Sequence, residues 1–407
     1  MPQATLQSSP ELTITLDKET TFTAGETICG RVIRKSHIVD PDASIIVRLY
    51  GRAEVKIHFA GGMTQQTWRS CFNLFGGSRD SVNIHQGPLH IPPNSPEYGS
   101  WPFAIILPTH PDPASLLRDN ADERSYLPLG DVSSQALPPT FYVKATAIGR
   151  VVEGYVQYYL EATLLGSGKK KYQATQPFSV RPISSPGAIT DFDTQHRSEF
   201  RRRIVSQRLV PGMDSKLSVG QQMKKFLGSS KVPGYSFSLQ LDIATVLQIG
   251  NPHTIPLRLR IKPIWEDTSE ILNNVPQTIL VKQFTLRLVL TTHYTSKRLR
   301  AKELQDTSSL LLANHTSKQS LKDAHIGAPT TADILMVPQD DASPPLDLGI
   351  ALGIRASKGS QGEEIYPTFT TYNMKNEHHL EWELELALAG EVSKHDGKQQ
   401  VTVMGPS

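Results

Sequence analysis

The chain has 407 residues, of which 38% are hydrophobic and 20% charged, so it is long enough for two to three domains and has a globular rather than a disordered composition. No apolar run reaches about 18 residues, and we expect no membrane-spanning segment. The net charge of +3 conceals a local excess, because residues 181–231 hold ten Lys and Arg against four acids and leave −3 for the rest of the chain.

Through the first 180 residues, short segments place an apolar residue at every second position, between turns rich in Gly, Pro and Asp. Side chains of a strand alternate between its two faces, so this pattern predicts strands with one buried face. The predicted strands cover residues 14–16, 28–32, 45–59, 103–107, 141–145 and 156–164.

The alternation lapses between residues 184 and 230 and then resumes, which predicts further strands over 237–243, 257–261, 284–290, 346–350 and 380–388. The last of these is the clearest, with five apolar residues at alternate positions and Glu at three of the positions between them. Leu and Glu favour helices, but a helix would scatter these leucines around its whole circumference. The polar stretch 305–322 is predicted to be a long surface loop.

Many short strands without a long helix predict an all-β protein built from two tandem, immunoglobulin-like antiparallel β-sandwich domains. We expect an N-terminal sandwich over residues 1–183, a basic interdomain segment over 184–230 and a C-terminal sandwich over 231–407. Both halves begin with a strand, a glycine turn and a second strand. Tandem sandwiches and the general similarity of hairpins explain this repeat equally well.

The sequence contains no nucleophile elbow, phosphate-binding loop, zinc motif or dinucleotide fingerprint, so we predict no catalytic, cofactor-binding or metal-binding residue and no enzymatic activity. The pair His378-His379 is a poor metal site, because neighbouring side chains on a strand point to opposite faces. The chain has only two cysteines, Cys29 and Cys71, which favours a reducing, cytoplasmic location.

The best candidate for a functional site is a cluster of arginines in the basic segment: Arg197, Arg201, Arg202, Arg203 and Arg208. Guanidinium groups bind phosphates and carboxylates through paired hydrogen bonds, which suits phosphorylated tails or anionic lipid headgroups. Phe200 and Ile204 could share one side of a short helix that faces a membrane or a partner. A solvated linker explains the same charges, and both interpretations stay open. Nucleic acid is not expected, because the cluster lacks interleaved aromatic residues.

Segments in both halves of the chain carry a family resemblance. In the first half they are Thr13 to Asp17, Thr23 to Val32, Val47 to Ala53, Trp101-Pro102-Phe103, Leu137 to Phe141 and Tyr155 to Leu164. These segments resemble the N-terminal domains of arrestin-like proteins. In the second half, Arg208 to Gly212 and Tyr366 to Asn373 resemble fungal arrestin-related proteins in particular. The resemblance extends over most of the chain, with gaps around residues 109–136 and 303–338. It implies an arrestin-like fold and an adaptor rather than a catalyst.

The resemblance also implies partners, namely the cytoplasmic tails or loops of membrane transporters or receptors, which the adaptor would link to endocytosis, trafficking or ubiquitin-dependent turnover. The expected location is the cytoplasm, at the plasma membrane or endosomes. Family members often recruit a ubiquitin ligase through PPxY segments, but no Pro-Pro pair here is followed by Tyr at the fourth position. The closest is Pro138-Pro139-Thr140-Phe141. The alternatives are a structural subunit of an endosomal coat and, less favoured, a β-sandwich enzyme.

Overall fold

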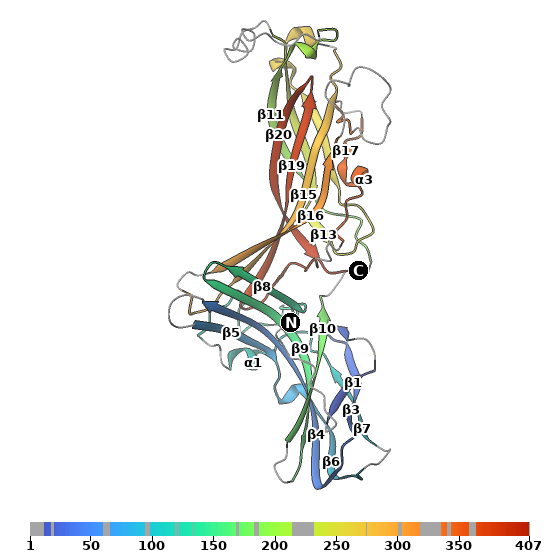
Figure 1. The fold of residues 1–407 in the computed structure, drawn as a ribbon, viewed down its shortest axis with the longest axis vertical. Helices are drawn as coiled ribbons and strands as arrows, with labels where there is room; N and C mark the ends of the chain where they lie inside the picture. The colour runs from blue at the N-terminus through green and yellow to red at the C-terminus, as the bar shows by residue number, and fades with distance from the viewer. Residues whose placement is uncertain are drawn as a thin grey trace. The chain divides into compact units, whose positions relative to one another are not determined.

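The computed structural model describes residues 12–17, 20–59, 66–93, 98–118, 120, 122–132, 134–167, 171–182, 187–213, 232–273, 275–299, 303–317, 335–339, 343–357 and 364–406. Most of them lie in strands of largely antiparallel sheets, which confirms the predicted all-β class (Figure 1). The described helices are short: α1 (Pro113–Leu117), α3 (Leu348–Leu352) and the 3-10 turns η1 (Ser78–Asp80), η2 (Gln207–Leu209), η3 (Trp265–Asp267) and η4 (Glu270–Leu272).

The chain forms two compact units, neither of which is continuous in sequence. Unit 1 comprises Met1–Ser184, Thr291–Thr307 and Tyr366–Asn376. Unit 2 comprises Ser185–Leu290, Ser308–Ile365 and Glu377–Ser407. Two segments from the second half of the chain therefore belong to unit 1.

Unit 1 has two sheets around one hydrophobic core. The smaller sheet has the order β1-β3-β7, with β1 (Thr13–Leu16), β3 (Thr27–Arg34) and β7 (Gly99–Ile106). The larger has the order β2-β10-β9-β4-β5, with β2 (Thr21–Thr23), β10 (Lys171–Arg181), β9 (Arg150–Leu165), β4 (Ile38–Phe59) and β5 (Gln66–Phe75). In addition, β6 (Ser81–Ile91) pairs with β4, and β8 (Phe141–Ala147) pairs with β9.

The two later segments of unit 1 supply part of its core. Tyr294, Leu299, Phe369, Tyr372 and Met374 are buried in the same cluster as the apolar residues of β4, β5 and β9. The Tyr372 ring stacks on Phe72 of β5 with 5.3 Å between ring centroids. The Asn373 amide donates hydrogen bonds to the backbone carbonyls of Ala53 (3.2 Å) and Ser70 (3.0 Å), so one side chain joins β4 to β5. These segments are structural parts of unit 1.

Opposite its apolar side, β4 carries one fully buried carboxylate, Glu54. Both guanidinium arms of Arg69 donate hydrogen bonds to it, and Arg52 and Lys56 lie within 3.7 Å and 3.5 Å of its oxygens. Burial acts to raise the pKa of Glu54, but the hydrogen bonds from Arg69 and Tyr155 and the charges of Arg69 and Arg52 outweigh burial and lower the pKa below its usual value.

A lowered pKa means that the ionised Glu54 stabilises the folded protein above the pKa of the unfolded chain, and that this stabilisation is lost as pH falls through the folded-state pKa. We therefore expect Glu54→Gln to cost about 2 kcal/mol at pH 7 and progressively less toward pH 3. Urea unfolding of wild type and variant at each pH measures this. A cost that is the same at pH 7 and pH 3 would show that the carboxylate contributes nothing through its charge.

Unit 2 also has two sheets around one core. One has the order β11-β12-β14-β17, with β11 (Thr194–Val205), β12 (Gly234–Ala244), β14 (Leu257–Pro263) and β17 (Leu346–Asp347). The other has the order β13-β20-β19-β15-β16, with β13 (Val246–Gln248), β20 (Glu391–Met404), β19 (Met374–Leu388), β15 (Ile279–Tyr294) and β16 (Leu304–Thr316). β19 begins within unit 1, where a short strand of that unit, β18 (Phe369–Thr370), pairs with Lys375 and Asn376.

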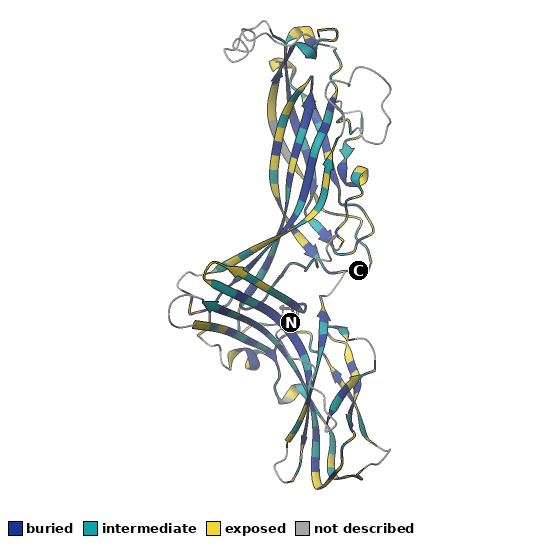
Figure 2. Ribbon diagram, in the orientation of Figure 1, coloured by how far each residue is buried: buried dark blue, intermediate teal, exposed yellow. Residues whose placement is uncertain are grey.

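The strand predicted over 380–388 is confirmed as part of β19, and all five of its apolar residues are buried. The alternation of buried and less buried residues along the strands is visible in Figure 2. The glutamates between them pair with cations on neighbouring strands, for example Glu383 with Arg287 at 2.9 Å and Glu385 with Lys394 at 2.7 Å. Burial of one face therefore overrides the helix propensity of Leu and Glu.

Two predicted elements are wrong. Residues 346–350 were expected to form a strand, but β17 ends at Asp347 and α3 follows, because the Asp347 carboxylate accepts a hydrogen bond from the Ile350 N–H and caps the helix. The expected loop over 305–322 contains β16, a largely exposed strand beside β15; residues 318–322 lie outside the described part of the chain. An edge strand needs few apolar residues, so its polar sequence does not exclude it.

Candidate functional site

The arginine cluster lies mainly on β11, which belongs to the sheet of unit 2. Its helical interpretation is therefore wrong, and so is its interpretation as a linker for residues 194–205. β11 runs antiparallel to β12, with Arg203 opposite Ser236, and a register shift interrupts the ladder between Arg197 and Phe200. Within the described part of the chain β11 pairs with β12 alone, so it is an edge strand.

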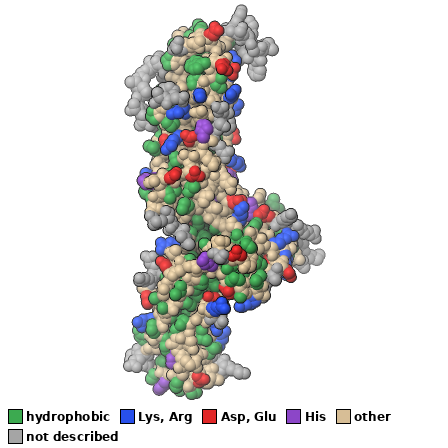
Figure 3. All heavy atoms as spheres, turned by 180° about the vertical axis from the view of Figure 1, so that it is seen from behind, with side chains coloured by type: hydrophobic (Ala, Val, Ile, Leu, Met, Phe, Trp, Pro, Cys, Tyr) green, Lys and Arg blue, Asp and Glu red, His purple; other side chains and the backbone are tan. Residues whose placement is uncertain are grey.

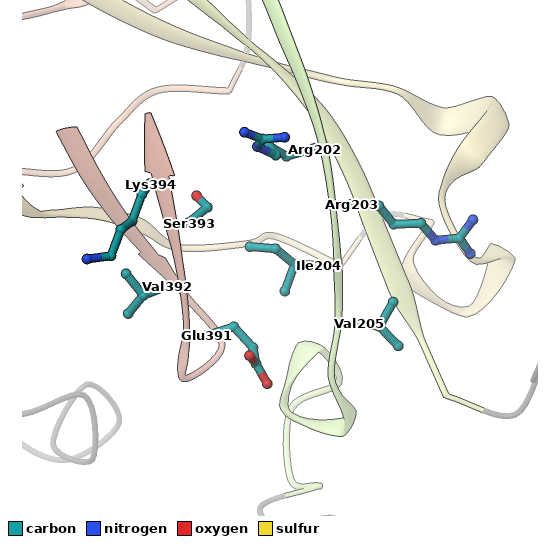
Figure 4. A pocket seen from close by; sticks show the side chains of 8 residues that line it. All are labelled: Arg202, Arg203, Ile204, Val205, Glu391, Val392, Ser393 and Lys394. Carbon is teal, nitrogen blue, oxygen red and sulfur yellow. The ribbon is translucent and has the colours of Figure 1, made fainter. Parts of the chain in front are cut away.

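The structure separates the arginines along this edge. Arg201, Arg202 and Arg203 are exposed, while the neighbouring Ile204 is buried in the core. The side chains of Arg202 and Arg203 point to opposite sides of the strand, as strand geometry requires (Figure 4). The side chain of Arg197 lies outside the described part of the structure.

Arg208 lies beyond the strand, in η2, and is half-buried. Its guanidinium lies against Gly390, where an added methyl group would come within 2.6 Å of Arg208 Nη1. Gly234 makes similar room for Arg203, whose Nε would be 2.8 Å from such a methyl group. Arg201, Arg202 and Arg203 thus form one group, and Arg208 supports the turn next to it.

A groove of about 610 Å³ lies between β11 and the start of β20. It is lined by residues 202–205 and 391–394. Figure 4 shows Arg202 and Ile204 pointing into the space between the strands, with Glu391 and Ser393 on the opposite side, while Lys394 points away. The residues of β20 were missed in the sequence, where only the Ala389-Gly390 turn after a clear strand could have indicated a returning hairpin strand.

The positive charge at the end of β11 comes from arginines that have no acidic partner among the described residues. Among the described residues, no ion pair involves Arg201, Arg202 or Arg203, whereas Lys394 pairs with Glu385, which raises the pKa of the lysine. Burial, together with the charge of Arg202, lowers the pKa of His395 to about 4, so this histidine is neutral near pH 7. Basic and acidic side chains are interspersed on the face that Figure 3 shows.

The turn between β19 and β20 forms one end of the groove. Ala389 and Gly390 both have positive φ, 49° and 80°, as in the two-residue hairpin turns that favour Asn-Gly. Ser206, next to β11, donates a hydrogen bond from its hydroxyl to the Ala389 carbonyl at 3.3 Å. The turn therefore ties the end of β11 to the β19–β20 hairpin.

Ala389 carries a methyl group in a conformation that disfavours it, and we expect Ala389→Asn to stabilise the protein by about 1 kcal/mol. Chemical denaturation of the wild type and the variant measures the change. Ala389→Val serves as the opposite control and should destabilise, because a β-branched residue tolerates this conformation least. Equal midpoints for all three proteins would contradict the turn geometry.

Other candidate chemistry finds no support in the described residues. No group of three or more His, Cys, Asp or Glu among them could hold a metal ion, and His379 pairs with Glu381 while His378 is buried. No described helix is long and apolar enough to cross a membrane. No protein-family model matches the chain, and no curated protein matches it either.

Proposed function

We propose that this chain is an arrestin-like adaptor made of two tandem β-sandwich domains, which binds cytoplasmic segments of membrane transporters or receptors. Two compact units, each with two sheets around its own core, are compatible with that plan. The observation that carries the proposal is the exposed arginine group on the edge strand β11, which forms no ion pair with any residue that the structure describes. Charges left without acidic partners remain available for a partner molecule.

The chemistry of the β11 edge favours an acidic segment. Three guanidinium groups lie within three consecutive residues, and the acid among the lining residues, Glu391, is on the other strand. Guanidinium binds carboxylate and phosphate groups in paired geometry, so acidic or phosphorylated tails are suitable partners. The adaptor would act at the cytoplasmic side of the plasma membrane or of endosomes and link its partner to endocytosis or turnover.

Recruitment of a ubiquitin ligase through Pro138-Pro139-Thr140-Phe141 has no structural support. Phe141 begins β8 and is only 2% exposed, packed edge-on against Tyr366 and Phe369. A ring held in the core cannot occupy the aromatic groove of another protein. A ligase would therefore reach the complex through another protein or another segment.

The test replaces all three arginines, Arg201→Gln, Arg202→Gln and Arg203→Gln, in the full chain. The probe is a labelled peptide of seven residues with alternating Glu and Val, measured by fluorescence anisotropy. We expect at least a tenfold loss of affinity for the triple variant. A matched control removes three exposed cations elsewhere in unit 2, each of which already pairs with an acid: Arg258→Gln, Arg287→Gln and Lys398→Gln.

The control has the same net charge as the test variant and should bind with less than a twofold change. Equal losses in both would mean that only total charge matters. A second experiment measures binding to vesicles with 30% phosphatidylserine. Each Lys or Arg near an anionic lipid surface contributes about 1 kcal/mol of binding free energy, so the arginine group could bind lipid instead. If neither the peptide nor the vesicles distinguish the test variant from wild type, the arginine group has no binding role.

A further inference from the structure

The backbone of β11 has hydrogen-bonding groups that face away from its sheet. In an antiparallel ladder, residues alternate between those bonded to the neighbouring strand and those whose N–H and C=O point the other way. The Ser206 N–H donates to the Pro233 carbonyl at 3.0 Å, which places Ser206, and by alternation Ile204 and Arg202, among the bonded residues.

The strand β12 supports this assignment from the other side. Gly234 lies opposite Val205. Its N–H donates to Ser269 Oγ at 2.9 Å, and its carbonyl accepts from the Ser269 N–H at 2.8 Å. Ser236 lies opposite Arg203. Its backbone carbonyl accepts from the Ile264 N–H at 2.8 Å, and its backbone N–H donates to Thr268 Oγ1 at 3.1 Å. Since these residues bond away from β11, the N–H and C=O of Arg203 and Val205 lie on the free edge, and by alternation those of Arg201 do too.

The side chains along this edge define what could lie beside it. Arg203 and Val205 share the outer face, whereas Arg202 and Ile204 share the inner face toward the groove (Figure 4). By the alternation of a strand, Arg201 also belongs to the outer face. A strand added here would place its outer side chains beside two arginines and its inner side chains over Ile204 and the mouth of the groove. The outer face therefore offers two arginines to acids, whereas the inner face has one, Arg202, beside the apolar Ile204, so acids outside and apolar residues inside are the better match.

A second copy of this chain is a poor occupant. Two β11 edges paired with each other would bring the arginines of both copies together, and like charges opposite each other destabilise a strand pair. Basic residues on an edge strand thus disfavour self-association while leaving the edge open to an acidic strand.

Resting on the proposed function, we propose that the partner segment binds as an added antiparallel strand on the free edge of β11. Its backbone exchanges hydrogen bonds with Arg201, Arg203 and Val205, its outward residues are acidic, and its inward residues are apolar and fill the mouth of the groove. Backbone pairing supplies affinity, and the alternating side chains supply selectivity.

This arrangement makes a prediction about individual peptide nitrogens. In the added strand, each outward glutamate lies directly opposite an outer-face residue of β11, such as Arg203. The two residues of such a pair exchange hydrogen bonds on this edge. The N–H groups of the glutamates therefore point toward β11, and the N–H groups of the valines point away from it. Two versions of the alternating Glu and Val peptide are needed, one methylated on the central Glu nitrogens and one on the central Val nitrogens. We expect the first to bind at least tenfold more weakly than the second.

A variant of the protein tests the same edge with its charges intact. Val205→Pro removes an N–H that β12 does not use, so the ladder of β11 is kept, and the proline ring blocks an approaching strand. Val205→Thr keeps the N–H and is the matched control. We expect a loss of peptide affinity of at least tenfold for the proline variant and less than twofold for the threonine variant, with unchanged circular dichroism in both.

The results separate this inference from the proposed function. If the unmethylated peptide binds and the arginine variant weakens it, but both methylated peptides bind equally, strand addition is overturned and the basic site stands. Equal affinity of Val205→Pro and Val205→Thr overturns it as well. If neither the unmethylated peptide nor the anionic vesicles bind, the proposed function itself fails.

Discussion

Residues 1–183 expressed alone are expected not to fold. Unit 1 takes five core residues from later segments, Tyr294, Leu299, Phe369, Tyr372 and Met374, and all are less than one tenth exposed. Removing one large buried side chain costs about 2–5 kcal/mol, so losing five costs about 10–25 kcal/mol, which is as large as the 5–15 kcal/mol that stabilises an ordinary domain. The measurement is thermal unfolding followed by circular dichroism, together with the dispersion of the amide NMR spectrum.

The full chain, treated identically, is the control and should unfold cooperatively. A cooperative transition and a dispersed spectrum for residues 1–183 would show that this part has a sufficient core of its own. The two later segments would then be attachments rather than components of unit 1.

Tyr372→Ala is expected to be the most damaging single substitution in the segment 366–376, with a cost of about 3–5 kcal/mol. The Tyr372 ring is 1% exposed, stacks on Phe72, and its hydroxyl donates a hydrogen bond to Gln135 Oε1. Truncation leaves a cavity beside Phe72 of β5 and leaves Gln135 Oε1 without the hydrogen bond from Tyr372. Urea denaturation, monitored by hydrogen exchange in β4 and β5, assigns the loss to unit 1.

Two further variants calibrate the result. Tyr372→Phe keeps the ring and should cost about 1 kcal/mol, the value of one hydrogen bond. Tyr98→Ala removes a ring that is 56% exposed and should change stability by less than about 0.5 kcal/mol. If Tyr372→Ala behaves like Tyr98→Ala, the contacts of Tyr372 with Phe72 and Gln135 do not stabilise unit 1.

How far the sequence predicted the fold depended on whether one face of a strand is apolar. In β19 the side chains at alternate positions from Leu380 to Leu388 are all buried, and periodicity alone identifies the strand. In β11 three consecutive arginines and a register shift after Arg197 break the period. Of the β11 residues whose burial the structure describes, Ile204 alone is buried. An edge strand paired on one side can form without a visible pattern.

The composition of the site depends on contacts between residues far apart in the sequence, which periodicity does not report. The arginines were recognisable as a group, but their position opposite Glu391 and Ser393 depends on how two sheets pack. Similarly, nothing local indicates that Asn373 bonds to β4 and β5, more than 300 positions earlier. The burial of Glu54 follows from Arg69 on the next strand and is equally invisible in its own segment.

Amide hydrogen exchange along β11 tests the central claim, that this basic segment is a strand with one open edge, most directly. We predict slow exchange at Ser206, whose N–H donates to the Pro233 carbonyl, and at Ile204 and Arg202, which the alternation of the ladder pairs with β12. Arg201, Arg203 and Val205 should exchange fast. Addition of the acidic peptide should then slow the three fast amides. Uniformly fast exchange across all six residues would mean a solvated linker, and would contradict both the edge strand and the binding site built on it.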